Sequence, residues 1–205
     1  METPVIVIIT LASMLLFLVL LCLLVSLVCF VKVFYSKTRK PLGKDEYDIP
    51  EGEIYEKFRG DIIDWIKMTR GMKSEAVEIK SHDGLTLRGR YYECKKGAPV
   101  ELLFHGYRGY SERDLSGGVE RCFALERNAL LIDQRASGTS DGHVISFGIN
   151  ESLDCVRWAE FAAEHFGKET PIILTGVSMG AATVVMASAE KLPENVMCVL
   201  ADCGY

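Results

Sequence analysis

The stretch that decides the fold is PIILTGVSMGAATVVMA, residues 171–187. It consists of a short apolar run, the motif GVSMG at 176–180, and an alanine-rich run typical of a helix. A chain that turns from strand to helix this sharply holds Ser178 in a strained backbone conformation, with its hydroxyl above the sheet. Gly176 and Gly180 keep side chains out of the close contacts that such a turn requires. The motif therefore predicts a catalytic nucleophile at Ser178.

A nucleophilic serine also needs hydrogen-bond donors for the oxyanion that forms on the substrate. The backbone N–H of Met179 lies at the start of the predicted helix, where the helix dipole adds to its effect. The second donor usually comes from the loop after an earlier strand, and we predict the N–H of Tyr107, within HGYRG at 105–109. His105 precedes the serine, whereas this arrangement brings its catalytic histidine last, so we expect His105 to organise the loop.

A third loop rich in glycine and serine, residues 133–143, follows the apolar run 129–132. Such a composition is typical of a tight loop. We expect Asp133 and Arg135 to pair and fix it. Asp133 precedes Ser178 in the chain, so a structural role is expected for it. Asp141 and His143 also precede Ser178, and simple turn chemistry explains them.

Strands and helices alternate from Glu75 onward. Residues 75–81 and 85–93 flank Asp83-Gly84, which is a strong hairpin signal. Later apolar runs at 100–104, 129–132, 171–175 and 196–201 predict strands, that at 129–132 a buried one, with helices between them. This order predicts an α/β protein with a largely parallel sheet and helices on both faces.

The helices are predicted less sharply than the strands. Residues 111–127 are expected to be helical only in their second half, because Gly117-Gly118 interrupts the first. Asn150 is expected to cap a helix that runs to about Phe166. A further helix is predicted for 179–191, and a loosely amphipathic one for 61–72, packing on the domain rather than lying in a membrane interface.

The motifs His-Gly-x-x-Gly, Asp-x-Arg-x-x-Gly-x-Ser and Gly-x-Ser-x-Gly, at the ends of consecutive predicted strands, together resemble the α/β-hydrolase superfamily. The resemblance covers roughly residues 75–205. Within the superfamily the chain looks like the bacterial, often membrane-tethered hydrolases of the serine aminopeptidase and Bem46-like groups. Ala136 stands where many members have glycine, and we expect no consequence for the chemistry. The resemblance implies an α/β-hydrolase fold and no cofactor.

The resemblance also implies which parts of the machinery lie elsewhere. Members carry the catalytic acid after a later strand and the histidine after the last one, so both are expected beyond Tyr205. The 205 residues are then the N-terminal two-thirds of the domain, inactive alone and prone to aggregate. His82, at the hairpin turn, and His165, near the end of a helix, cannot substitute.

The N-terminal segment is predicted to be a transmembrane helix. Residues 3–31 contain no charged residue and, as a helix, would reach about 40 Å, more than a bilayer core of about 30 Å. A cleaved signal peptide is disfavoured, because the run is too long and no basic residue precedes it. The predicted organisation is an anchor at 1–36, a juxtamembrane linker at 37–60, and a partial hydrolase domain at 61–205.

The charges that flank this segment predict its orientation. Five basic residues follow it, which favours a single-pass protein with its C-terminal domain in the cytoplasm: Lys32, Lys37, Arg39, Lys40 and Lys44. From Asp45 onward the chain has 18 basic and 27 acidic residues, which argues against a nucleic-acid partner. The seven cysteines show no paired or metal-ligand spacing, so no metal is expected and a reducing compartment fits.

Two classes of function remain open from the sequence. The first is a membrane-anchored hydrolase of an ester, thioester or amide, acting on a small-molecule or acyl substrate through an acyl-serine intermediate. Tyr107, Arg108 and Tyr110 are expected to line the visible part of its pocket, which would suit an apolar or an acidic acyl group. The second is a noncatalytic membrane protein that uses the truncated fold for binding or as a scaffold.

Overall fold

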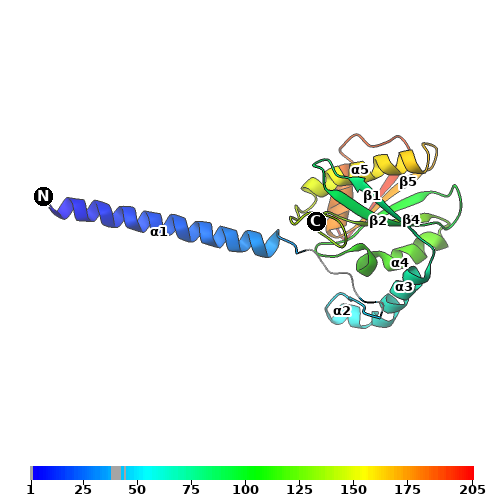
Figure 1. The fold of residues 1–205 in the computed structure, drawn as a ribbon, viewed down its shortest axis with the longest axis horizontal. Coiled ribbons are helices and arrows are strands. Elements are labelled where there is room, and N and C mark those ends of the chain that lie inside the picture. Colours follow the sequence, from blue (N-terminus) through cyan, green and yellow to red (C-terminus); the bar gives the residue numbers. More distant parts are fainter. Residues whose placement is uncertain (1, 38–42, 44) are drawn as a thin grey trace. The chain divides into compact units, whose positions relative to one another are not determined.

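The computed structural model describes residues 2–37, 43 and 45–205. They belong to two compact units, Met1–Tyr35 and Ser36–Tyr205 (Figure 1). Of the five basic residues that predict the orientation, Lys32 and Lys37 are described, whereas Arg39, Lys40 and Lys44 lie outside the described residues.

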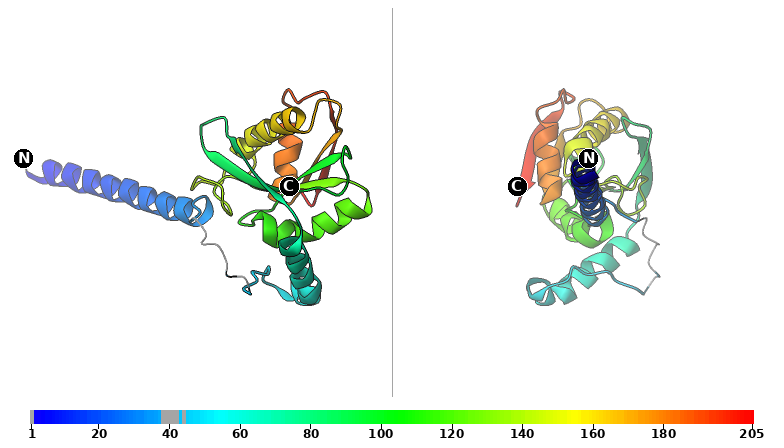
Figure 2. Two further views of the ribbon diagram at one scale, coloured as in Figure 1. Left: turned by 45° about the vertical axis from the view of Figure 1, so that its right-hand side comes forward. Right: turned by 90° about the vertical axis from the view of Figure 1, so that its left-hand side faces the viewer.

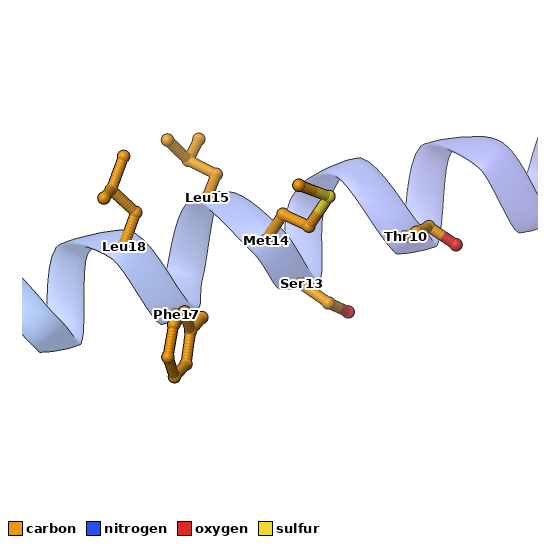
Figure 3. Close-up of a pocket in the computed structure, with 6 residues that line it drawn as sticks. All are labelled: Thr10, Ser13, Met14, Leu15, Phe17 and Leu18. Atoms are coloured by element: carbon orange, nitrogen blue, oxygen red, sulfur yellow. The ribbon is translucent and has the colours of Figure 1, made fainter.

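The first unit is one long helix, α1, Glu2–Val33. Its segment Thr3–Val33 is the one described helix that is long and apolar enough to cross a membrane, by length and composition. Two of its hydroxyl side chains, Thr10 and Ser13, each donate to a carbonyl oxygen four residues earlier, at 2.8 Å. Figure 3 shows them with neighbouring Met, Leu and Phe side chains, all projecting outward from this single helix. The hydroxyls are thus satisfied within the helix, as a low-dielectric surrounding requires.

The second unit is built on a mixed sheet of six described strands in the order β1-β2-β4-β3-β5-β6. β1 pairs antiparallel with β2 and β2 with β4, whereas the remaining pairs are parallel. The predicted hairpin and the four predicted apolar strands are confirmed. The strands are β1 Glu75–Lys80, β2 Thr86–Tyr92, β3 Val100–Phe104, β4 Asn128–Asp133, β5 Ile172–Val177 and β6 Val196–Asp202.

Helices cover both faces of this sheet (Figures 1 and 2). On one face, α5 (Ile149–His165) and α6 (Met179–Ala187) pack through a core that includes Trp158, Leu102 and Leu174. On the other face, α4 (Ser111–Ala124) packs through Leu115 and its neighbours. The central strands β3 and β4 are buried along their whole length, which explains their largely apolar sequences. The one charged side chain inside β3, Glu101, is buried and pairs with Arg121 and Arg127.

The prediction for residues 111–127 was wrong, because α4 is helical throughout, including Gly117 and Gly118. A side chain at Gly117 would lie 2.9 Å from the Trp65 ring, which α3 (Arg59–Gly71) lays across it. A side chain at Gly118 would collide with Leu103 of β3. The two glycines therefore serve close packing on both sides of α4, and these tertiary contacts outweigh their low helix propensity.

The predicted cap of α5 was also wrong. Asn150 is the second residue of the helix, and Gly148, at φ 100°, occupies the cap position. The Glu151 carboxylate accepts hydrogen bonds from the backbone N–H of Gly148 at 2.9 Å and of Ser146 at 2.8 Å. An acidic side chain in the first turn of the helix thus reaches back to backbone donors that precede it, as the glutamate of a capping box does.

The region before the sheet contains a short helix, α2 (Glu53–Glu56), followed by α3. The predicted amphipathic helix at 61–72 corresponds to α3, which begins two residues earlier. Its buried residues are Ile66 and Thr69, and the Thr69 hydroxyl lies 3.1 Å from that of Ser116 on α4. As predicted, α3 packs on the domain.

Candidate active site

Ser178 lies in the turn between β5 and α6 with a left-handed φ of 55° and ψ of −116°. Glycines make this turn possible. A Cβ at Gly180 would lie 2.8 Å from the carbonyl oxygen of His105, at the end of β3. A Cβ at Gly176 would collide with the backbone of Gly180 and would lie 2.6 Å from the Ala181 nitrogen. The sharp reversal predicted from GVSMG is therefore present, with Ser178 half-buried just before the first turn of α6.

The loop after β3 lies directly against Ser178. A Cβ at Gly106 would lie 3.4 Å from the Ser178 Cβ and 3.8 Å from its hydroxyl oxygen. The chain then turns, with the N–H of Gly109 donating to the carbonyl oxygen of Gly106 at 3.1 Å. The loop backbone at Gly106 therefore lies beside the serine, and this turn follows it directly.

The two residues predicted to donate to an oxyanion lie in one apolar cluster. Met179 is buried together with Ala136 and Ile145, and Tyr107 packs against these three. Met179 is the first residue of α6, and a first helical N–H has no intrahelical acceptor. The loops after β3, β4 and β5 thus meet around the start of α6.

His105 is fully buried and both of its ring nitrogens are engaged. Nε2 accepts a hydrogen bond from the backbone N–H of Gln134 at 3.0 Å, and Nδ1 lies 2.8 Å from the carbonyl oxygen of Gly106. The Gln134 side chain donates to the carbonyl oxygen of His105 at 2.7 Å and accepts from Thr183 of α6. Burial lowers the pKa of His105, so the ring is held neutral with the proton on Nδ1. Its hydrogen bonds join the loops after β3 and β4 to α6.

Asp133 fixes the loops, although not through the predicted partner. Its carboxylate accepts from the backbone N–H of Ser111 at 2.9 Å and from that of Thr139 at 2.8 Å. Gly138, at φ 53°, packs so closely against this carboxylate that a side chain there would collide with it. The expected pair of Asp133 and Arg135 was therefore wrong, since backbone N–H groups satisfy the carboxylate.

Arg135 instead joins α5 to the β1–β2 turn. Its guanidinium donates to Asp154 of α5 at 2.6 and 2.8 Å and to Asp83 at 3.0 and 3.1 Å. Burial alone would lower the pKa of Arg135, but these two carboxylates outweigh it and raise the pKa. The hydrogen bond from Arg135 lowers the pKa of Asp83 to about 2. We call Asp83, Arg135 and Asp154 the arginine clamp.

The clamp overlaps a group of side chains that could in principle ligate a metal. His82, Asp83 and Asp154 bring one ligand atom each within 4.8 Å of one another. The guanidinium of Arg135 already pairs with both carboxylates, and it carries a permanent positive charge. The group therefore fits an ion-pair network better than a cation site.

Backbone strain gathers at the carboxyl edge of the sheet. Four non-glycine residues with positive φ each follow a different strand, β3 to β6: Arg108 at 55°, Ala136 at 58°, Ser178 at 55° and Cys203 at 52°. Such conformations cost free energy and concentrate at functional sites. At Ala136, where the resemblance leads us to expect glycine, the left-handed conformation costs about 1 kcal/mol.

The predicted pocket residues lie in the loop after β3. Arg108 is exposed, and its guanidinium lies 5.2 Å from the ring centre of Tyr107. Tyr110 immediately precedes α4, and the guanidinium of Arg113 lies 5.8 Å from its ring centre. Where either side chain lies relative to a bound substrate remains a prediction.

Phe147 is an aromatic neighbour that no sequence motif indicated. Its ring stacks on Tyr107 with 5.0 Å between ring centres. Its carbonyl oxygen accepts a hydrogen bond from the Tyr205 hydroxyl at 2.9 Å. Phe147 therefore adds a second aromatic ring to the loop that contacts Ser178. Its backbone is also unusual, with a positive φ of 54°.

No acid–base pair is assembled on Ser178 by the described part of the chain, because no described residue bonds to its hydroxyl. The histidines are engaged elsewhere. His82 lies 3.5 Å from Asp154, His143 lies 3.3 Å from the carbonyl oxygen of Ser36, and His165 lies 3.7 Å from Glu75. The backbone N–H of Ser178 donates to the carbonyl oxygen of Asp202 at 2.8 Å.

Comparisons with known proteins agree with this architecture, although no protein-family model matches the chain. A polyketide transferase, ATR5 of Stachybotrys chlorohalonatus, is 29% identical over 133 residues, which cover 63% of this chain and 44% of that protein. The esterase Pf2001 of Pyrococcus furiosus superposes with a TM-score of 0.61 at 20% identity, covering 84% of this chain and 58% of the esterase.

The α/β hydrolase GrgF of Penicillium superposes with a TM-score of 0.57 at 22% identity, covering 63% of this chain and 45% of GrgF. The chain thus has an α/β-hydrolase fold with esterases among its structural neighbours. It spans about half the length of the proteins that it matches.

Proposed function

We propose that this chain is the nucleophile-bearing part of a serine hydrolase that acts on an ester, thioester or amide through an acyl-serine intermediate. One observation carries the proposal. Ser178 has the strained conformation of φ 55° and ψ −116° just before α6, with the loop backbone at Gly106 against it. Distant similarity to esterases and other α/β hydrolases supports it.

In the proposed reaction the Ser178 hydroxyl oxygen attacks the carbonyl carbon of the substrate. The negative charge that forms on the carbonyl oxygen is held by the backbone N–H groups of Met179 and Tyr107. The hydroxyl proton passes to a histidine base, and an acidic side chain orients this base; we propose that both come from outside the 205 residues. Without them the rate falls by a factor on the order of 10⁴ to 10⁶.

We propose that the substrate is a small molecule or an acyl group, bound beside Ser178. Tyr107, Arg108 and Tyr110 form the predicted lining, and the Tyr107–Phe147 stack adds an apolar surface. An aromatic surface favours an apolar acyl group, whereas the exposed guanidinium of Arg108 would attract an acidic one. Comparing acetyl, octanoyl and succinyl esters would separate these two preferences.

We also propose that α1 anchors the protein as a single-pass membrane helix with the second unit in the cytoplasm. Its length, its apolar composition and its internally bonded hydroxyls support the anchor. The basic residues that follow it support the orientation. Resistance to alkaline carbonate extraction, together with protease protection in oriented vesicles, tests both statements.

The test of the catalytic proposal uses the protein extended through its downstream coding sequence. We expect a fluorophosphonate probe to label it and p-nitrophenyl acetate to be hydrolysed, and Ser178→Ala to abolish both. Ser188→Ala, at an exposed serine just after the same helix, is the matched control and should change neither. Turnover that is unaffected by Ser178→Ala would refute the enzyme proposal.

The 205-residue chain by itself provides a second arm of this test. We expect it to be labelled far more slowly than the extended protein, because its Ser178 hydroxyl has no described base. The alternative function is a noncatalytic protein that keeps the fold for binding or as a scaffold. The alternative is supported if the extended protein also fails to react with the probe.

A further inference from the structure

The short helix α2 and the residues after it carry an apolar cluster that the domain does not cover. Ile54, Tyr55 and Phe58 are 74%, 42% and 51% exposed, and α2 has no buried residue. We call these three residues the α2 cluster. In Figures 1 and 2 α2 lies at the end of α3 that is remote from the sheet. An exposed apolar cluster of this kind is a candidate contact surface, and the rest of the molecule must indicate its partner.

We call α2 and α3 together the arm; the α2 cluster lies on one side of it. Positions 54, 55 and 58 share one face of a helical turn. The N–H of Phe58 donates to the carbonyl oxygen of Tyr55 at 3.0 Å, and the N–H of Ile62 donates to that of Phe58 at 2.9 Å. These bonds join α2 to α3 through a turn at residues 57–58, so the α2 cluster is presented as a fixed surface.

The arm is fixed in turn to the rest of its unit. The Trp65 indole N–H donates to Glu120 of α4, and Arg70 pairs with Glu112 at 2.7 Å. The Arg70 guanidinium also donates to the carbonyl oxygen of Glu46 at 3.0 Å and lies 5.1 Å from the ring centre of Tyr47. Residues 46 and 47, which precede α2 in the sequence, thus contact Arg70 of α3.

The partner that fits this surface is a lipid bilayer, because the proposed anchor α1 keeps the second unit within reach of one. Only residues 36–52 separate the unit of α1 from α2. At roughly 3.5 Å per residue they cannot extend beyond about 60 Å. A covalent tether of this length raises the effective concentration of the α2 cluster at the bilayer, so a weak apolar contact becomes a persistent one.

The residues of the arm indicate the kind of lipid surface. Tyr and Phe are typical of the membrane interface, and Lys57 and Arg59 flank Phe58, where long basic side chains can reach the headgroups. Residues 51–61 contain four carboxylates against these two cations, so the arm is acidic overall. Apolar insertion rather than attraction to anionic lipid must therefore drive the contact.

We propose that the α2 cluster inserts into the interfacial layer of the bilayer that α1 spans, and that it does so on zwitterionic phosphatidylcholine without requiring anionic lipid. The inference rests on the proposed membrane anchor. It goes beyond that anchor, because it assigns to the second unit a membrane-contacting surface of its own.

The test places the full chain in nanodiscs of dioleoylphosphatidylcholine or its brominated analogue. Phe58→Trp puts a fluorophore in the α2 cluster, and the emission of Trp65 and Trp158 in the parent chain is subtracted. Met197→Trp, at an exposed apolar residue of β6, is the matched control. We expect the emission added by Phe58→Trp to shift to the blue and to fall about twofold in brominated discs, while the control stays unquenched.

Two further measurements test the same proposal. Ile54→Ser and Tyr55→Ser, added to Phe58→Trp, should abolish most of the quenching, because the apolar contact is lost. Replacing part of the lipid by phosphatidylserine should not increase the quenching, because the arm carries more carboxylates than cations.

The outcomes separate the anchor from the α2 cluster. If the chain stays in the discs but Phe58→Trp is quenched no more than Met197→Trp, the inference fails and the anchor stands. If alkaline treatment releases the chain from the discs, the anchor fails and the inference with it. A blue shift without bromine quenching, in discs that hold two chains, would show that a second copy covers the α2 cluster and would overturn the lipid contact.

Discussion

Ser178 owes its position to glycines whose side chains would meet backbone atoms. At Gly180 a Cβ would lie 2.7 Å from the Phe104 carbonyl carbon and 2.8 Å from the His105 oxygen. Gly180→Ala should therefore push α6 away from β3 and lower the free energy of unfolding by about 1 to 3 kcal/mol. Urea denaturation and probe labelling of the extended protein measure both effects.

Gly60→Ala provides the matched control. A Cβ at Gly60, in the first turn of α3, meets nothing within 4 Å, so this variant should keep or slightly raise the stability. Equal losses in the two variants would contradict the steric account of the turn.

His105 yields a prediction that depends on pH. Because burial lowers its pKa in the folded state, the unfolded chain takes up a proton below about pH 6.5 while the folded chain does not. The contribution of His105 to stability is complete above that pH and is lost as the pH falls, by up to about 1.4 kcal/mol per unit. In NMR titrations the His105 ring should remain neutral below about pH 6.5, the ordinary pKa of a histidine.

A variant separates this effect from the other titrating groups. His105→Asn should lower the stability at neutral pH and should flatten its dependence on pH between about 6.5 and 5. An unchanged slope in the variant would show that other groups cause the dependence.

Single residues could be predicted where a motif fixes a backbone requirement. Ser178 and its glycines were predicted because the turn tolerates few residue types. The partners of Arg135 were not, since Asp83 and Asp154 lie far from it in the sequence and polar pairs leave no periodic signal. Phe147 was missed for the same reason: its contact with Tyr107 joins two loops.

At the scale of elements, the arginine clamp joins three segments that the sheet does not pair directly. Asp154→Asn would leave the buried guanidinium of Arg135 with a single carboxylate, Asp83, which is half exposed. We expect a loss of about 3 to 5 kcal/mol in the free energy of unfolding, because the lost partner is a buried charge. Urea denaturation followed by Trp158 fluorescence measures it.

A surface pair on the same helix is the control for this prediction. Arg157→Ala breaks an exposed pair with Glu160 and should cost no more than about 0.5 kcal/mol. Similar losses for Asp154→Asn and Arg157→Ala would contradict the role assigned to the clamp. Adding zinc or a chelator should leave the melting temperature unchanged, because Arg135 occupies the carboxylates.

The central strands were easier to predict than the helices because their burial makes them largely apolar runs between turn signals. The hairpin and the parallel strands followed from that pattern. The error at α4 had a physical cause: Gly117 and Gly118 weaken a helix by themselves, yet here they let Trp65 and Leu103 approach. Only the tertiary partner distinguishes a glycine that breaks a helix from one that permits close packing.

At the scale of the whole molecule, β6 forms an edge of the described sheet, with Met197 and Leu200 exposed along it. An unpaired edge with apolar side chains favours pairing with other chains. We expect the 205-residue chain to self-associate in sedimentation velocity experiments, and Met197→Lys to reduce this association by blunting the edge.

Ile54→Lys removes an equally exposed apolar side chain away from the sheet and is the control. It should leave association through the β6 edge unchanged when α1 is held in detergent. If both variants reduced association equally, general hydrophobicity rather than the sheet edge would be responsible.

The overall architecture could be predicted because length, charge and hydropathy act over many residues. The apolar N-terminal helix and the α/β domain followed from such averages. The α2 cluster could not be predicted, since three apolar residues in a polar stretch do not reveal whether they are buried. Exposure is a property of the folded unit, and it appears only when α3 is placed on α4.

The left-handed conformation of Ser178 bears on the choice between the catalytic and the scaffold function, because the two functions place different demands on the residue at this position. Holding a serine at this φ and ψ weakens the fold by about 1 to 3 kcal/mol, and glycine would adopt the same backbone without that strain. A lineage that needed only a binding scaffold would improve its stability by exchanging serine for glycine. Under the proposed catalytic function the strained serine keeps a hydroxyl where the nucleophile is needed, whereas under the scaffold alternative Ser178→Gly would relieve the strain and lose nothing.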